Sequence, residues 1–370
     1  HRLIRRQRQM CIRDSYYRTL LDNYPNSRLA DKALENIPYA YFLDRNYTEA
    51  INSFKEAINL EILSSDDLEI KKILEECYVK LAQKYHKNDD YSLSAENYLN
   101  AVIILKEIKD NFPDTNEAFI SIYKIPEYLY NAALNFNKIR NWDKSIEALE
   151  DIVNNYYESK YFYDASYLLS NTYINKAVEL VNSNNYQEGI EEFLKILDLD
   201  ALNYTYNNIN DYQKNRVFSN IPLSVLKNIA EDKYNSGDYE KTLFLCEVIV
   251  EYNPEKEEEI IPLLIDSKLK IIASSTYNLF EQPVPERKFW GPEKSILIIE
   301  DNTEFDLTIY LKGPEYKIIK VEKNSTSEIE ITAGSYEAAA ELNNPDILPY
   351  YGKVTYEESQ KYREEYTITN

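Results

Sequence analysis

The sequence is poor in the residues that build metal centres, disulfide frameworks and phosphate loops. Its 370 residues include three Cys, two His, one Met and six Gly. So few Cys and His argue against a zinc or iron–sulfur centre and against a disulfide scaffold. Scarce Gly leaves little material for the tight loops that cradle phosphates. The sequence also lacks an uncharged apolar run long enough to cross a bilayer. We therefore expect no cofactor, no bound metal and no membrane insertion within this sequence.

Basic residues are outnumbered, with 42 Lys and Arg against 63 Asp and Glu and a formal net charge of −21. The chain offers few groups that could neutralise phosphates, so nucleic acid is not an expected partner. A protein or peptide that is neutral or basic is a better electrostatic match. Hydrophobic residues make up 44% of the sequence, which is enough for a folded core.

Residues 1–15, HRLIRRQRQMCIRDS, differ in composition from the rest of the sequence. They hold the only Met, Met10, together with Cys11 and five Arg, whereas Lys is the usual basic residue elsewhere. The end of this segment, from Met10 to Ser15, resembles the translation of a transposon adapter used in sequencing libraries. We expect a non-native tail here, with the native N-terminus and any signal or anchor missing. An Arg-rich targeting peptide or nucleic-acid-binding arm is the alternative.

One pattern recurs five times between residues 16 and 280. A polar turn leads to an aromatic residue, and small or apolar residues follow three, seven and ten positions later. The five aromatics are Tyr47, Tyr91, Trp142, Tyr186 and Tyr239. Such positions lie along one face of a helix, and a second helical stripe precedes each turn. The pattern predicts about five antiparallel helical hairpins. It also predicts that Pro126 and Pro222 open helices and that residues 203–220 form a loop or a short extra helix.

This pattern resembles the tetratricopeptide repeat (TPR) over roughly residues 16–280. The string YPNSRLADKAL at residues 24–34 is similar to the TPR variant of Tol–Pal and outer-membrane assembly proteins. The resemblance implies an α-solenoid that binds peptides or protein domains on its concave face. Three residues depart from the repeat, because Pro38 stands at a small position and Lys176 and Lys233 stand at apolar positions. The variant favours a bacterial cell envelope or exported location, although it also occurs in cytoplasmic proteins.

A Pro-rich stretch, residues 281–294, is expected to be a linker. Beyond it the hydrophobic period changes from helical to alternating, and turn residues separate seven short runs between residues 295 and 370. This pattern predicts a small antiparallel β-sandwich, similar to immunoglobulin-like domains. The expected fold class is therefore multidomain, with a TPR-like α-solenoid of about five hairpins followed by a β-sandwich.

One column of the repeat suggests a binding surface. On the face of each first helix that lines a TPR groove, the sixth position holds Asn36, Lys80, Asn131, Asn175 and Asn228. An Asn amide can both donate to and accept from a peptide backbone. Aromatics on neighbouring turns of that face are Tyr39, Phe42, Tyr130 and Tyr234. The competing interpretation is chance, because Asn and Tyr are abundant throughout the chain.

The candidate chemical residues do not form a catalytic set. His86 stands without a second His or Cys in register, so we interpret it as a solvated residue at a helix end. Cys77 and Cys246 lie on helical faces far apart in sequence, which is typical of buried, inert thiols. We therefore expect a non-enzymatic scaffold or adaptor that binds a peptide or protein. The alternatives are the accessory C-terminal part of a truncated envelope enzyme or sensor, and a cell-surface binding module that acts through the β-sandwich.

Overall fold

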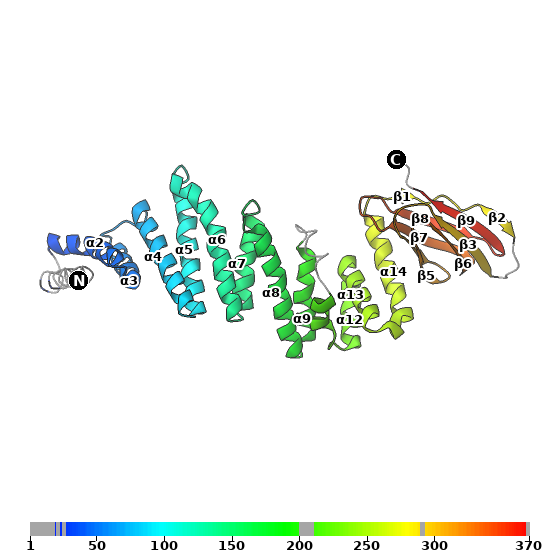
Figure 1. Ribbon diagram of the computed structural model, residues 1–370, viewed down its shortest axis with the longest axis horizontal. Helices are drawn as coiled ribbons and strands as arrows, with labels where there is room; N and C mark the ends of the chain where they lie inside the picture. The colour runs from blue at the N-terminus through cyan, green and yellow to red at the C-terminus, as the bar shows by residue number, and fades with distance from the viewer. Residues whose placement is uncertain (1–18, 20–22, 24–26, 200–210, 289–292, 368–370) are drawn as a thin grey trace. The chain divides into compact units, whose positions relative to one another are not determined.

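The computed structural model describes residues 19, 23, 27–199, 211–288 and 293–367. These residues form twelve α-helices followed by nine β-strands (Figure 1). They divide into two compact units, residues 1–179 with 198–209 and residues 180–197 with 210–370. The predicted tail, residues 1–15, lies outside the described residues. The predicted fold class, a TPR-like helical solenoid followed by a β-domain, is confirmed.

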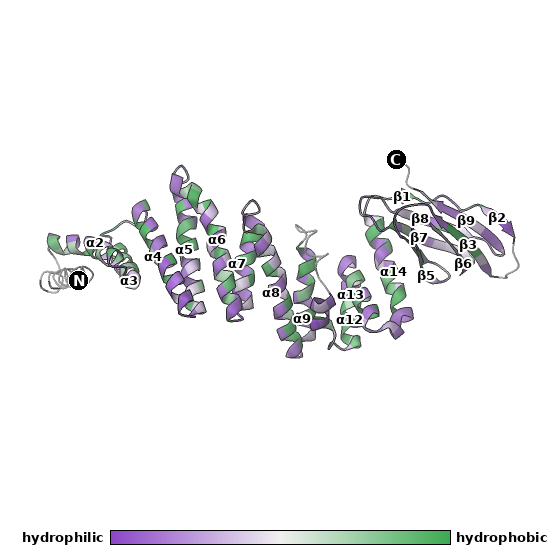
Figure 2. Ribbon diagram, viewed as in Figure 1, coloured by the Kyte–Doolittle hydropathy of each residue, from purple (hydrophilic) through white to green (hydrophobic). Residues whose placement is uncertain are grey.

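The first unit is a row of antiparallel helices, in which each helix packs on the next from α2 to α7. Their bounds are α2 (Arg28–Leu43), α3 (Tyr47–Asn59), α4 (Leu68–Lys87), α5 (Tyr91–Asn111), α6 (Asn116–Lys138), α7 (Trp142–Asn155) and α8 (Phe162–Asn182). Hydrophobic and hydrophilic residues alternate along each helix in Figure 2, as expected for helices with one buried face. We call α2, α4, α6 and α8 the first helices of their hairpins, and α3, α5 and α7 the second helices.

The repeated positions after each turn aromatic form the core of the hairpins. Ala50, Phe54 and Ala57 of α3 are all 0% exposed. Buried Ser94 and Ser145 occupy the first of these positions in α5 and α7, and their hydroxyls donate to carbonyls of the preceding helix, at 2.9 and 3.2 Å. A small residue at this position therefore lets the two helices approach closely, and its hydroxyl does not remain unsatisfied.

The five hairpin turns share one backbone geometry. One residue in each turn is left-handed, with φ values between 56° and 83°, at Arg45, Asp89, Arg140, Asn184 and Gly237. The next amide donates to the carbonyl five residues back, for example from Asn141 to Phe136 at 2.9 Å. This is the Schellman motif, in which glycine is the usual left-handed residue. Only one of the five turns has glycine there, so the other four carry a backbone cost.

The two lysines that stand at apolar positions of the repeat form ion pairs. One of the two prolines that we expected to open a helix lies elsewhere. Lys176 contacts Asp143 at 2.7 Å, and Lys233 contacts Glu191 at 2.8 Å, so both cations at apolar positions are neutralised. Pro222 is the N-cap of α12, as predicted. Pro126 instead lies inside α6, a helix of 23 residues that is not interrupted at the proline. The packing of α6 on α5 and α7 outweighs the backbone hydrogen bond that proline removes.

The helices of the second unit lead to the β-domain. They are α9 (Tyr186–Leu194), η1 (Lys195–Asp198), α11 (Asp211–Phe218), α12 (Leu223–Asn235), α13 (Tyr239–Tyr252), η2 (Pro254–Lys256) and α14 (Glu257–Ser274). For residues 203–220 we expected a loop or a short extra helix; residues 203–210 lie outside the described residues, and α11 follows them. Its Phe218 packs on Phe193 and Phe244, with ring centroids 4.8 and 5.9 Å away.

The β-domain is a sandwich of two sheets, with strand orders β1-β8-β7-β4-β5 and β2-β9-β3-β6. The strands are β1 (Asn278–Leu279), β2 (Pro285–Lys288), β3 (Lys294–Asp301), β4 (Leu307–Lys312), β5 (Tyr316–Val321), β6 (Ser325–Thr332), β7 (Gly334–Leu342), β8 (Tyr350–Tyr356) and β9 (Gln360–Tyr366). Two differences from our expectation concern its edges and its strand directions. β2 lies within the predicted linker, and β3–β9 and β1–β8 pair in parallel.

The last helix covers one face of the five-stranded sheet. Ile265, Leu269 and Ile272 of α14 form a buried cluster with Ala339 of β7, and Tyr310 and Tyr351 pack at its margin. Ala339 is 0% exposed because it points away from the sandwich interior and toward this helix. The small side chain allows the helix to lie close to the sheet.

Candidate functional site

The predicted asparagine column lies on the first helices. Asn36 of α2, Lys80 of α4 and Asn228 of α12 are exposed, whereas Asn131 of α6 and Asn175 of α8 are half-buried. Asn36 uses its amide locally, because its Nδ2 donates to the Lys32 carbonyl at 2.6 Å. Asn228 belongs to the second unit, so the column is divided between the two units.

The predicted groove aromatics are half-buried and engaged in ring contacts. Tyr39 packs edge-on against Phe54 with ring centroids 5.1 Å apart, and Phe42 lies 6.4 Å from Tyr47. Tyr130 lies 5.5 Å from Tyr161 at the start of α8. Burial raises the pKa of Tyr39 and of Tyr130, because it disfavours the phenolate. These rings therefore contribute to the packing of the helices, and each leaves only part of its surface for a ligand.

Tyr234 is the predicted aromatic of the second unit. Its ring lies 5.4 Å from that of Tyr239, across the turn between α12 and α13. Burial is the main cause that raises its pKa, and the Asp266 carboxylate adds to the shift. Tyr234 thus helps to close the last hairpin.

Sequence reasoning missed a more exposed set of aromatics on the same two helices as Asn131 and Asn175. Phe119 and Tyr123 of α6 are 57% and 61% exposed, and Tyr163 and Tyr167 of α8 are 68% and 63% exposed. The rings of Phe119 and Tyr123 lie 5.1 Å apart, edge to face. We call these four residues the aromatic rows.

The aromatic rows are continuous with the asparagine column. In α6 the residues at steps of four are Phe119, Tyr123, Glu127 and Asn131, and in α8 they are Tyr163, Tyr167, Asn171 and Asn175. Residues at this spacing form one ridge of a helix. The two rows are related by the same 44-residue shift that relates Asn131 to Asn175. The same spacing in the sequence relates Phe119 to Tyr163 and Tyr123 to Tyr167, so it is the signal that could have identified the rows.

Polar contacts hold the first helices α4, α6 and α8 beside one another. Glu75 of α4 accepts from Lys124 at 3.1 Å and from the Tyr128 hydroxyl at 2.7 Å, both on α6. Burial and the Glu75 carboxylate raise the pKa of Tyr128, which keeps its proton on the hydroxyl. Asn137 of α6 donates to Thr172 of α8 at 3.0 Å.

His86 takes part in the same set of helix-to-helix contacts. Its Nδ1 lies 2.7 Å from Oδ1 of the buried Asn135, and its ring packs edge-on against Tyr91. Asn135 in turn donates to the Asn131 carbonyl at 2.6 Å. His86 is exposed in the last turn of α4, as we expected, and its contact with Asn135 also links α4 to α6.

The charge beside the aromatic rows is negative. Glu127 lies within the row of α6, and Asp164 directly follows Tyr163. Neither carboxylate forms an ion pair among the described residues, whereas Lys124 is paired with Glu75. A ligand at this surface meets two unneutralised carboxylates.

A hollow of the first unit lies between the second helices α5 and α7, with a volume of about 500 Å³. Leu99, Val102 and Leu129 contribute its apolar part. The Lys106–Asp151 ion pair crosses it at 2.7 Å. This pair joins the two helices, so the hollow is partly closed by contacts that the fold itself uses.

The residues that could carry chemistry are dispersed among those that the structure describes. No group of three His, Cys, Asp or Glu side chains in residues 27–199, 211–288 and 293–367 is placed to hold a metal ion. Cys77 and Cys246 are buried, and burial raises the pKa of each thiol to about 12. Among the described helices, none is long and apolar enough to cross a membrane.

Comparisons with known proteins agree with the helical-repeat architecture. A family profile for the tetratricopeptide repeat matches residues 127–159, which include the C-terminal half of α6, the turn after it and the whole of α7. No curated protein sequence matches the chain.

The solved structures that match the chain are distant in sequence and have low TM-scores. The apo form of RapI is 14% identical over 73% of this chain and 95% of its own, with a TM-score of 0.25. BtubC from P. vanneervenii is 15% identical over 78% of this chain and 96% of its own, with a TM-score of 0.21. A solved TPR domain is 12% identical over 75% of this chain and 100% of its own, with a TM-score of 0.17. The fold and the repeat at residues 127–159 define a TPR-like helical-repeat protein with a C-terminal β-domain, a class that suggests a protein-interaction scaffold.

Proposed function

We propose that this protein is a non-enzymatic scaffold that binds an extended peptide segment of a partner protein on the first helices α6 and α8. The observation that carries this proposal is the continuity of the aromatic rows with Asn131 and Asn175. Four exposed rings on a protein surface are costly to hydrate, and aromatic side chains are enriched where proteins bind one another. Amides at the end of the same ridges can pair with the peptide backbone.

The preferred peptide is neutral or basic and carries at least two apolar or aromatic side chains. Apolar side chains would cover the rings of Tyr123 and Tyr167, while Lys or Arg would meet Glu127 and Asp164. The formal charge of −21 adds a long-range attraction for a basic partner, which makes association faster at low salt. The other predicted residues of the first unit, Asn36, Lys80, Tyr39, Phe42 and Tyr130, remain part of the proposal as a weaker extension of this central region. Asn228 and Tyr234 belong to the second unit and remain a separate prediction.

The test is selection of peptides from a random displayed library on the folded protein, followed by titration with the strongest binder. Tyr123→Ala and Tyr167→Ala should each weaken binding by about 2 kcal/mol, as buried aromatic anchors do. Asn131→Ala and Asn175→Ala should each cost about 1 kcal/mol, a typical net hydrogen bond. Tyr212→Ala is the matched control, because Tyr212 is 71% exposed but lies on α11 in the second unit.

Selected peptides should be enriched in Lys, Arg and aromatic residues, and their affinity should fall as salt is raised. The proposal fails if the four substitutions leave the affinity unchanged while Tyr212→Ala or a change in the β-domain abolishes it. Binding through the β-domain would instead favour the alternative function, a cell-surface binding module that acts through the β-sandwich.

A further inference from the structure

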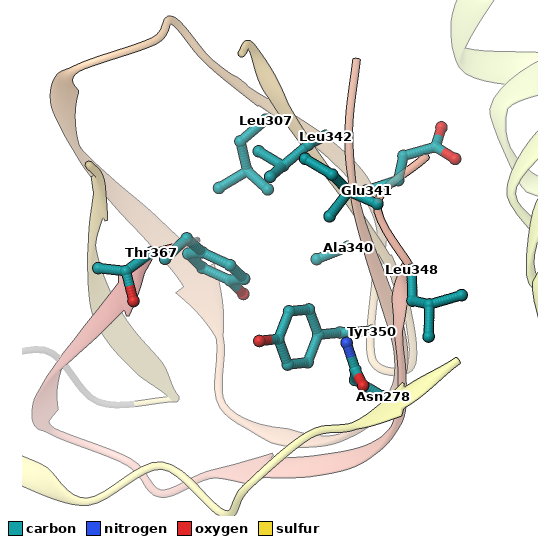
Figure 3. Close-up of a pocket in the computed structure, with 10 residues that line it drawn as sticks. Asn278, Leu307, Ala340, Glu341, Leu342, Leu348, Tyr350 and Thr367 are labelled. Carbon is teal, nitrogen blue, oxygen red and sulfur yellow. The ribbon is translucent and has the colours of Figure 1, made fainter. Parts of the chain in front are cut away.

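A small pocket lies at one end of the β-domain, between its two sheets (Figure 3). Its volume is about 120 Å³. Leu307, Ala340 and Leu342 form its apolar floor, Tyr350 and Tyr366 stand at its sides, and Leu348 lies at its rim. The pocket therefore takes side chains from β4, β7 and β8 of one sheet and from β9 of the other.

The pocket exists because β7 places a small residue, Ala340, toward the interior of the sandwich. Ala340 is 1% exposed and belongs to the main apolar core of the domain. It lies opposite Ile309 on β4 and opposite Tyr350 on β8. A larger aliphatic side chain at this position would fill the floor of the pocket, as neighbouring core positions are filled. Ala339, the preceding residue, points the other way and faces α14.

Three residues of the lining carry hydroxyl groups: Tyr350, Tyr366 and Thr367. The Tyr350 hydroxyl points into the pocket in Figure 3 and has no hydrogen-bond partner among the described residues. The Tyr366 hydroxyl, in contrast, donates to Glu364 at 3.1 Å. The rings of these two tyrosines lie 6.0 Å apart and nearly perpendicular, at 85°. The walls therefore offer aromatic faces and edges, together with the Tyr350 hydroxyl and, from Thr367, a second hydroxyl group.

The charged groups near the pocket are already neutralised or hydrogen-bonded. Glu341, which contributes to the lining, contacts Lys268 at 2.7 Å and accepts from the Tyr310 hydroxyl at 2.9 Å. Glu364 accepts from the Tyr356 hydroxyl at 2.6 Å as well as from Tyr366. A charged ligand would lose its hydration here without gaining a counterion, so the pocket selects an uncharged one.

We propose that this pocket binds an uncharged aromatic ring that bears one hydrogen-bonding group, of the size of phenol. The volume agrees with one ring, since an engineered cavity of roughly 150 Å³ holds a benzene molecule. The ring would pack edge to face on the tyrosines, and its polar group would pair with the Tyr350 hydroxyl. This site lies in the second unit and is independent of the peptide surface on α6 and α8. The ring could belong to a tyrosine of a partner protein or to a free phenolic compound, which have the same chemistry.

The test is an NMR titration of the full chain with p-cresol, the analogue of a tyrosine side chain, followed by the amide signals of Ala340 and Tyr350. We expect saturable binding with a dissociation constant in the millimolar range. Leu348→Trp, at a rim residue that is 44% exposed, should block the pocket and abolish these shifts. Leu279→Trp adds the same bulk at a residue that is 74% exposed and does not line the pocket, so it should leave binding unchanged.

The hydroxyl is tested by Tyr350→Phe, which keeps the ring. This variant should weaken p-cresol binding roughly five- to ten-fold, as the loss of one hydrogen bond does, and should leave toluene binding unchanged. A blocked tripeptide, acetyl-Gly-Tyr-Gly-amide, distinguishes the sources: competition with p-cresol favours a partner's tyrosine, and no competition favours a free phenolic compound. The proposal is overturned if p-cresol causes no saturable shifts, or if both Leu348→Trp and Tyr350→Phe bind it as the unmodified chain does.

Discussion

Lys268 of α14 lies 2.7 Å from Glu341 of β7, so the last helix and the β-domain are joined by a charge contact. A second ion pair repeats the connection, from Asp266 of α14 to Lys312 of β4, also at 2.7 Å. Both pairs flank the apolar cluster in which Ile265 and Leu269 meet Ala339. The β-domain is therefore the cover of the last helix, whose exposed apolar face would otherwise need a capping helix.

Replacing Ile265 by Ala should destabilise α14 and the β-domain together. Ile265 is 0% exposed in the cluster between them, and truncating such a side chain costs about 2–4 kcal/mol. In denaturant unfolding of this variant, the midpoint for α14 and the midpoint for the β-domain should both shift to lower denaturant concentration. Ile271→Ala is the control, since Ile271 is half-buried and outside the cluster. Equal effects of the two substitutions would contradict the assigned interface.

The hairpin turns give a reciprocal pair of stability predictions. Gly237 has φ of 83°, and an added Cβ would meet nothing within 4 Å, so Gly237→Ala changes only the backbone preference. It should lower the free energy of unfolding by about 1 kcal/mol. Arg140 has φ of 56° in the equivalent turn, so Arg140→Gly should be stabilising. Thermal melts of both variants test this, and a loss of stability in Arg140→Gly would mean that its side chain matters more than its backbone.

The hairpins could be predicted from the sequence because their determinants are local. The turn aromatics and the small residues after them recur at fixed spacing, and the structure buries Ala50, Phe54 and Ala57 as that spacing requires. The parallel pairing of β3 with β9 could not be predicted in this way, since it joins residues about 65 positions apart. The prolines of residues 281–294 predict a linker, but proline is also tolerated in edge strands, and β2 begins at Pro285 on the edge of its sheet.

The candidate site was only partly predictable for a different reason. Residue type indicated which amides could bind a peptide, but not which aromatics remain exposed. Tyr130 and Tyr123 lie on the same helix and read alike in sequence, yet Tyr130 packs on Tyr161 whereas Tyr123 is 61% exposed. Exposure depends on whether a neighbouring helix covers the ring, which is a property of the packed hairpins.

The two cysteines of the helical region should be unreactive until the protein unfolds. Burial raises the pKa of Cys77 and of Cys246 to about 12, so almost no thiolate exists at neutral pH. Iodoacetamide at pH 8 followed by peptide mass spectrometry should find both thiols unmodified in the native protein and alkylated in denaturant. Rapid alkylation of Cys246 in the native protein would mean that α13 opens locally, with a free energy of opening far below the free energy of global unfolding.

The carboxyl of Glu364 should make stability depend on pH in a defined direction. It lies in the β-domain beneath the hydroxyls of Tyr356 and Tyr366, and burial raises its pKa above the ordinary value of 4.5 despite their hydrogen bonds. Below that value the group is protonated in both states. As the pH rises through it, the unfolded chain releases the proton while the folded chain retains it, so the free energy of unfolding falls until the folded pKa is passed.

Glu364→Gln removes this titration, because the amide is neutral at every pH. The stability of the variant relative to the unmodified protein should therefore improve as the pH rises above 4.5 and level off once the folded pKa is passed, as measured by urea unfolding at a series of pH values. Glu358→Gln provides the control, since Glu358 is exposed and the difference should stay constant across the same range. If the relative stability of Glu364→Gln instead declines as the pH rises, then the carboxylate is stabilised in the fold by its tyrosine hydrogen bonds, and burial is not the dominant effect.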